Sequence, residues 1–138
     1  MSATPPPDSP EALLGEARRL LEQPNARTAG LWPRAVALLA RQALEGALVR
    51  YWQGRGLAAV AETSLRSQLL CLSQLASSEV AGPASYTWAA LTSACHAHAY
   101  ELAPTASELG GWIEAVDGLM RGLRSQVLDS HDELLGRG

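Results

Sequence analysis

Apolar residues recur at helical spacing in five segments of the chain, and polar or turn-forming residues separate the segments. Within each segment, leucines, alanines and tryptophans return every three or four residues, which places them on one face of a helix. The predicted helices cover residues 9–23, 33–54, 62–76, 84–102 and 105–128. Because the connections between them are short, we expect an all-α fold, an antiparallel bundle of about five helices.

Capping and turn-forming residues mark several ends of these helices. Ser9, which a proline follows, predicts the start of the first helix, because its hydroxyl can cap the first turn. Thr105 and Glu108 form an S/T-x-x-E capping box at the start of the last helix. The pair Gly82-Pro83 predicts a break before the fourth helix.

The length of 138 residues leaves room for one domain. We expect this domain to cover residues 9–128. The proline-rich residues 1–8 are predicted to form a disordered tail, and the charged, glycine-rich residues 129–138 a frayed C-terminal tail.

Composition supports the helical prediction and narrows the class of protein. The chain has no Phe, no Lys and a single Ile, and Leu and Ala dominate its apolar residues, a composition typical of helices rather than strands. Its net charge is -3 and it has no run of arginines, which argues against general binding of duplex DNA. No secretory signal and no stretch long enough to span a membrane is evident, so we expect a cytoplasmic protein.

Reactive side chains cluster in one segment, where Cys95 precedes His96, His98 and Tyr100. The two histidines are two residues apart and point in different directions on a helix, whereas two zinc ligands on one helix need a spacing of three or four. Cys95 and His98 have that spacing, but no second ligand pair is evident. We therefore expect no metal, and since nucleotide-binding motifs are also missing, no cofactor.

Two other helix faces carry candidate functional residues. Arg34 and Arg41 lie two turns apart on the narrow polar edge of the second helix, together with Glu45. This edge is either a solvated strip with an Arg41–Glu45 ion pair or a pair of arginines facing a phosphate site. On the fourth helix, three residues spaced seven positions apart lie on a side away from the core, which favours contact with a second chain. The predicted dimer face consists of Tyr86, Ser93 and Tyr100.

The segment ARQALEGAL at residues 40–48 and the triplet His98-Ala99-Tyr100 together resemble the HEPN domains. These are small α-helical bundles, usually dimeric, that occur in toxin–antitoxin pairs, phage-defence systems and RNA-processing assemblies. The resemblance covers residues 9–128 as an arrangement of helices. It implies a HEPN-like bundle, a second copy of the chain as partner, and either RNA or a nucleotide as ligand.

In the HEPN members that are metal-independent ribonucleases, the motif consists of an Arg and a His separated by four to six residues. A Tyr often stands two residues after the His. The His and the Arg act at a cleft between two subunits. His98 and Tyr100 match the second half of this motif, but residues 91–93, where the Arg would stand, are Leu, Thr and Ser. The candidates for a replacement charge lie on other helices, namely Arg41, Arg66 and Arg34.

Three functions follow from this reading. The first is a HEPN-like homodimer that binds RNA or a nucleotide, is catalytically degenerate, and works with a cognate antitoxin or defence partner. The second is an active endoribonuclease with His98 or His96 as general base and Tyr100 in its site. In this hypothesis Arg41 or Arg66 is the phosphate clamp. The third is a non-catalytic helical module for protein interaction, in which the histidines and tyrosines fill an interface.

Overall fold

The computed structural model describes residues 4–23, 31–96 and 102–136. The helices in chain order are α1 (Pro10–Glu22), α2 (Trp32–Gly54), α3 (Leu65–Leu75), α4 (Ser78–Cys95) and α5 (Ala106–Gly136), with the 3-10 helix η2 (Ala58–Glu62) between α2 and α3. The described part of the chain contains no strand. The all-α prediction with five helices is therefore confirmed.

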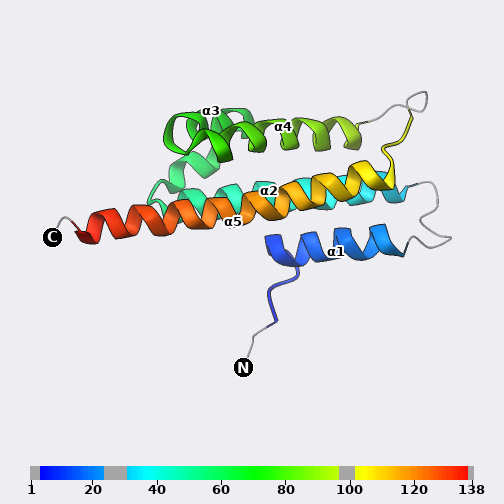
Figure 1. Ribbon diagram of the computed structural model, residues 1–138, viewed down its shortest axis with the longest axis horizontal. Helices are drawn as coiled ribbons and strands as arrows, with labels where there is room; N and C mark the ends of the chain where they lie inside the picture. The colour runs from blue at the N-terminus through cyan, green and yellow to red at the C-terminus, as the bar shows by residue number, and fades with distance from the viewer. Residues whose placement is uncertain (1–3, 24–30, 97–101, 137–138) are drawn as a thin grey trace.

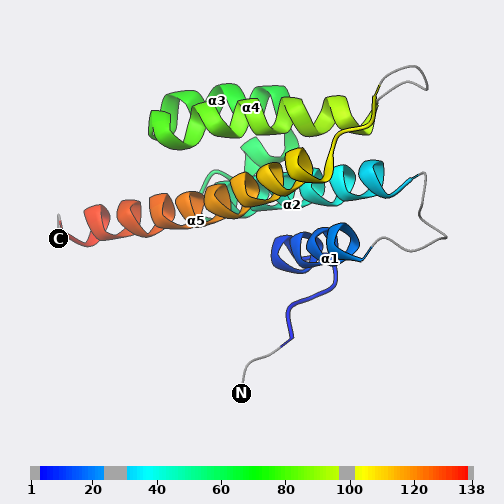
Figure 2. The ribbon, with the colours of Figure 1, turned by 45° about the vertical axis from the view of Figure 1, so that its right-hand side comes forward.

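The helices form three layers, with α2 and α5 side by side in the middle one (Figure 1). The helices α3 and α4 lie together on one side of this pair, and α1 lies on the other (Figure 2). In both views α2 and α5 run in the same direction, while α1 and α4 run in the opposite one. The start of α2 therefore lies beside the ends of α1 and α4 and the start of α5.

The core is centred on α2, whose small side chains let the neighbouring helices approach closely. Four alanines of α2 are buried, at positions 37, 40, 43 and 47. They are joined by the larger buried residues of the same helix, Val36, Leu44, Leu48, Tyr51 and Trp52. The opposing side of α5 contributes Leu109, Ile113, Val116, Leu119, Met120 and Leu123. These positions match the apolar stripes expected from the sequence.

The two predicted helix starts with capping residues are confirmed. The Ala12 amide donates to Ser9 Oγ over 3.2 Å at the start of α1. Before α5, the Glu108 amide donates to Thr105 Oγ1, and the Thr105 amide donates to Glu108 Oε1, each over 3.1 Å. This reciprocal pair satisfies two amides that a helix end otherwise leaves without partners.

A buried glutamine attaches η2 and α3 to α2. The Trp52 indole Nε1 donates to Gln68 Oε1 over 3.2 Å. Gln68 Nε2 in turn donates to the carbonyl oxygens of Ala61, at 3.3 Å, and Thr63, at 3.0 Å. Since a buried amide without partners is costly, this network fixes the connection between α2 and α3.

The predicted break at Gly82-Pro83 is wrong, because α4 already begins at Ser78 and includes both residues. Pro83 is the sixth residue of the helix, so its missing amide removes a single hydrogen bond near the N-terminus. Burial of Val80, Ala81 and Ala84 on the same turns offsets that loss. The predicted end of this helix at Leu102 involves residues 97–101, which lie outside the described residues.

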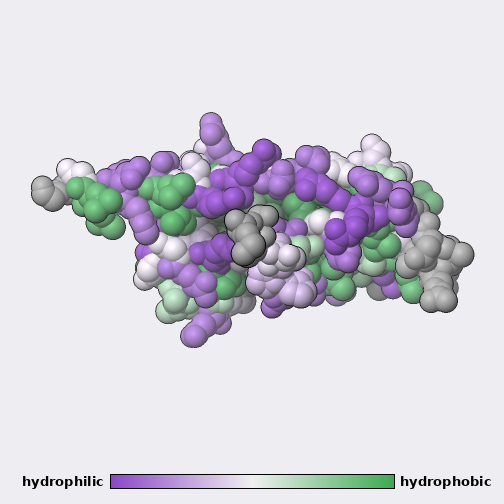
Figure 3. All heavy atoms as spheres, turned by 90° about the horizontal axis from the view of Figure 1, so that it is seen from below, coloured by the Kyte–Doolittle hydropathy of each residue, from purple (hydrophilic) through white to green (hydrophobic). Residues whose placement is uncertain are grey.

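The helix α5 continues to Gly136, eight residues past the predicted domain end at Leu128. Its last turns extend beyond the other helices (Figures 1 and 2). Three leucines on this part are exposed, Leu128 at 62%, Leu134 at 75% and Leu135 at 80%. Seen from the side of α1, hydrophobic atoms gather at the same end of the molecule (Figure 3).

No helix within the described ranges is long and apolar enough to cross a membrane.

Candidate functional site

The end of α4 holds the part of the histidine segment that the structure describes. His96 follows the last residue of the helix, and its amide donates to the carbonyl oxygens of Thr92 and Ser93, each over 3.2 Å. Its side chain is exposed. His98 and Tyr100, the residues that carry the resemblance to the HEPN motif, lie outside the described residues.

Two of the three candidate arginines lie beside this end of α4. Because α2 and α4 run in opposite directions, the first half of α2 borders the last half of α4. Burial raises the pKa of the Cys95 thiol, and Arg41, Glu45 and Arg34 act on the same thiol through space. The three charged groups of α2 therefore lie near enough to act on the residue that directly precedes His96.

Arg41 and Glu45 form the ion pair expected from their spacing. Arg41 Nε lies 3.1 Å from Glu45 Oε1, and the two side chains are only 22% and 31% exposed. The same Nε atom has no partner aligned for a hydrogen bond, so the contact is electrostatic. The ion pair leaves the other guanidinium donors of Arg41 available, so it fits the solvated-strip interpretation and the phosphate interpretation alike.

Two further buried polar atoms lie on the adjoining face of α4. Trp88 Nε1 and Thr92 Oγ1 have no hydrogen-bond partner among the described residues. With Cys95 they follow the spacing of i, i+4 and i+7, so they share the side of α4 that borders Arg34 and Arg41. We call the surface made by Arg34, Arg41, Glu45, Trp88, Thr92 and Cys95 the α2–α4 seam. Buried polar atoms without partners are rare in proteins, which makes this seam unusual.

The third candidate arginine is not at this site. Arg66 is exposed on α3 and lines a shallow pocket of about 320 Å³ that also includes Ser85 of α4. Ser85 precedes His96 by eleven residues, which corresponds to about 16 Å of helix. Arg34 and Arg41 thus act on Cys95, the residue before His96, whereas Arg66 lies beside an earlier part of α4.

The predicted dimer face is partly described. Tyr86 is 74% exposed on the outer side of α4, and Ser93, two turns later, is exposed as well. Ser93 lines a hollow that reaches Trp112 at the start of α5. Tyr100 belongs to the segment that is not described. The two described members do share a solvent-facing side of α4, as expected.

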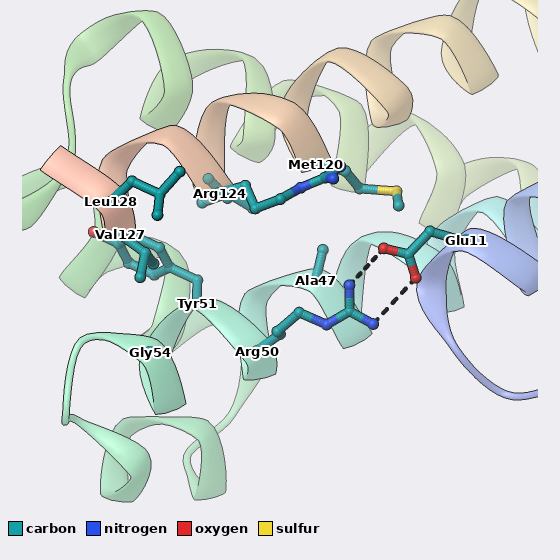
Figure 4. A pocket seen from close by; sticks show the side chains of 10 residues that line it. Glu11, Ala47, Arg50, Tyr51, Gly54, Met120, Arg124, Val127 and Leu128 are labelled. Atoms are coloured by element: carbon teal, nitrogen blue, oxygen red, sulfur yellow. Dashed lines mark hydrogen bonds and ion pairs between the residues drawn. The ribbon is translucent and has the colours of Figure 1, made fainter. Parts of the chain in front are cut away.

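A pocket between α1, α2 and α5 escaped the sequence prediction. It has a volume of about 250 Å³ and lies at the opposite end of α2 from Arg34. Arg50 spans the pocket edge to pair with Glu11, with Nη2 3.1 Å from Oε2, and Arg124 lies across from them (Figure 4). The hydrogen bond from Arg50 holds the pKa of the Glu11 carboxyl below its ordinary value. No sequence signal marks this pocket, because it depends on where α1 begins relative to α2.

The described residues contain no group of three or more His, Cys, Asp and Glu side chains that could hold a metal ion. Comparison of the chain with protein-family models, curated proteins and solved structures yields no significant match. The resemblance to HEPN domains accordingly rests on residues 40–48 and on His98-Ala99-Tyr100.

Proposed function

We propose that this chain is a HEPN-like module that pairs with a second copy of itself and binds RNA or a nucleotide through phosphate, without cleaving it. The observation that carries the proposal is that Arg34 and Arg41 lie on the half of α2 that borders the end of α4, where both act on the Cys95 thiol through space. A guanidinium is always charged and offers parallel donors that match phosphate oxygens. The seam is thus suited to an anion.

The charges of the seam indicate weak and salt-sensitive binding. Glu45 offsets one of the two arginines, and the chain as a whole has a net charge of -3. Two phosphate contacts predict that the logarithm of the binding constant for single-stranded RNA falls with the logarithm of salt with a slope of about -1.4. Binding should accordingly be measured at low salt.

The same geometry favours binding over catalysis. The HEPN ribonuclease motif places an Arg before the His on the same helix, and residues 91–93 supply none. Arg41 is held by Glu45 and is mostly buried, so it is a poor substitute for a donor aimed at the charge that develops on phosphate. Arg66 is too distant to act with His96.

Titration of a labelled single-stranded RNA oligomer and of nucleotides at low salt tests this proposal. We expect Arg34→Gln/Arg41→Gln to weaken binding by about tenfold or more, because both charges that face the phosphate are removed. Arg18→Gln/Arg19→Gln is the matched control, since it removes two positive charges from α1, on the other side of α2 from α4. Equal loss in the control, or no binding by the wild type, would contradict the proposal.

The endoribonuclease alternative is separated by a cleavage assay in EDTA. We expect the RNA to stay intact with the wild type, with His96→Ala and with His98→Ala. Cleavage by the wild type that disappears in one histidine variant would assign the chain to the active ribonucleases instead.

A further inference from the structure

The pocket between α1, α2 and α5 is the uncovered continuation of a longer groove. The helix α1 fills the groove between α2 and α5 from Pro10 onward. Beyond the start of α1, the groove is open and its floor is apolar. The lining residues on α2 are Ala47, Arg50, Tyr51 and Gly54, and those on α5 are Met120, Leu123, Arg124, Val127 and Leu128.

We propose that a second copy of this chain occupies this open groove with the last turns of its own α5. This inference deepens the proposed homodimer by naming where the copies meet, and it does not depend on phosphate binding. The volume of about 250 Å³ is below the usual range for sites of drug-sized ligands, but it accommodates a few apolar side chains. Such side chains are exposed nearby on Leu134 and Leu135.

An antiparallel pairing of the two α5 helices about Leu128 matches these features. In this register residue 128 faces its own copy, and residues 128–136 of one chain lie along residues 120–128 of the other. Those are the residues of α5 that line the groove. Leu134 and Leu135 thereby come level with residues 122 and 121, within reach of the apolar floor. Such a contact is two-fold symmetric, as homodimer interfaces usually are.

The charges along α5 are complementary in the same register. Asp132 of one copy comes level with Arg124 of the other, and the symmetry creates this pair twice. On a helical wheel Asp132 lies next to Leu128 and Leu135, so it borders the apolar stripe. Arg124 acts through space on Glu11 of its own chain, but neither Arg124 nor Asp132 forms a hydrogen bond or an ion pair with a described residue. Charge complementarity thus favours a second copy as the occupant.

Analytical ultracentrifugation of the full chain over a range of concentrations tests the inference. We expect the wild type to reach about twice the mass of one 14.6 kDa chain, and Leu134→Asp/Leu135→Asp to remain a single chain. Both leucines are exposed, so the variant should fold, which circular dichroism checks. Continued RNA binding by this variant would show that the two proposals stand separately.

A charge exchange tests the register. Arg124→Asp and Asp132→Arg should each raise the dissociation constant of the dimer by about tenfold, because each places like charges together twice. The double variant Arg124→Asp/Asp132→Arg should restore it to within about threefold of the wild type. Asp129→Arg makes the same change in charge on another side of α5, and it should have little effect.

Three results would overturn the inference. A wild type that stays a single chain would remove it together with the proposed homodimer. If Tyr86→Asp dissociates the dimer and the leucine variant does not, the contact lies on α4. The proposed homodimer would then stand, with a different interface. A double charge variant no better than its single parents would exclude the antiparallel register.

Discussion

The two ends of α2 differ in the kind of group that they leave without a partner, polar atoms at one end and apolar surface at the other. At its first half, the α2–α4 seam buries Arg41 Nε, Trp88 Nε1 and Thr92 Oγ1, none of which has a hydrogen-bond partner in the described part of the chain. At its last half, the groove beside α5 leaves apolar surface without a cover, with Arg50 already paired to Glu11. The first end needs a polar partner and the second an apolar one. One helix can therefore serve ligand binding and self-association at separate places.

The difference shows why the apolar face of a helix does not by itself reveal a binding surface. Both halves of α2 carry buried apolar residues at helical spacing, mostly alanines in the first half and larger side chains in the second. What distinguishes them is the length and position of the neighbouring helices, because α1 begins only at Pro10 while α5 extends to Gly136. Where one neighbour stops early, the face of the next is left open.

The largest expected effect sharpens the description of the groove. A Cβ added at Gly54 would lie 2.9 and 3.2 Å from the two γ carbons of Val127. We expect Gly54→Ala to lower the free energy of unfolding by about 1–2 kcal/mol, because the overlap with a stiff valine exceeds the gain in helix propensity. Chemical denaturation measures this change.

The control for this variant is a glycine of α5 in open space. Nothing lies within 4 Å of a Cβ added at Gly118, so Gly118→Ala should raise stability by up to about 1 kcal/mol. If both variants gain stability alike, α5 does not approach α2 as closely as described.

The next effect concerns the α2–α4 seam and has the opposite sign. Thr92 Oγ1 is buried and has no hydrogen-bond partner among the residues that the structure describes, so replacing the hydroxyl by a methyl group in Thr92→Val removes an unmet hydrogen-bonding group. We expect stability to stay equal or rise by up to about 1 kcal/mol. A loss of more than about 1 kcal/mol on denaturation would mean that the hydroxyl has a partner in solution.

The smallest effect lies at the edge of the groove. The pKa of Glu11 is lowered chiefly by its hydrogen bond from Arg50, so ionised Glu11 stabilises the fold. This contribution is fully present above the ordinary pKa of 4.5 and is lost as the pH falls through the lower pKa of the folded state. Both side chains are about half exposed, so Glu11→Gln should cost less than about 1 kcal/mol at neutral pH.

Thermal unfolding of the wild type and Glu11→Gln at several pH values checks this expectation. Their difference in stability should be constant above pH 4.5 and should shrink below it. A difference that grows on acidification would contradict the assigned sign.

The sequence predicted the fold well wherever a local signal decided the structure. The cap at Ser9 and the capping box of Thr105 and Glu108 act within one turn, and both are present. Gly82-Pro83 misled, because tertiary burial of Val80 and Ala84 outweighed a local helix breaker. The close approach of α4 to α5 at Gly122, where an added Cβ would lie 3.1 Å from Val80, is likewise a tertiary contact.

The candidate site was predictable only in part. The spacing of Arg41 and Glu45 was enough to predict their ion pair, which is local to one helix. That Arg34 and Arg41, rather than Arg66, act on Cys95 depends on the relative direction of α2 and α4, which helical periodicity does not encode. The groove beside α5 depends in the same way on the relative positions of three helices.

The most direct test follows a labelled single-stranded RNA by sedimentation with three proteins at low salt. With the wild type we expect the RNA to move with a dimer, and with Leu134→Asp/Leu135→Asp to move with a single chain. With Arg34→Gln/Arg41→Gln we expect the RNA to stay free while the protein remains dimeric. If the leucine variant releases the RNA and the arginine variant retains it, the assignment of the two ends of α2 is wrong.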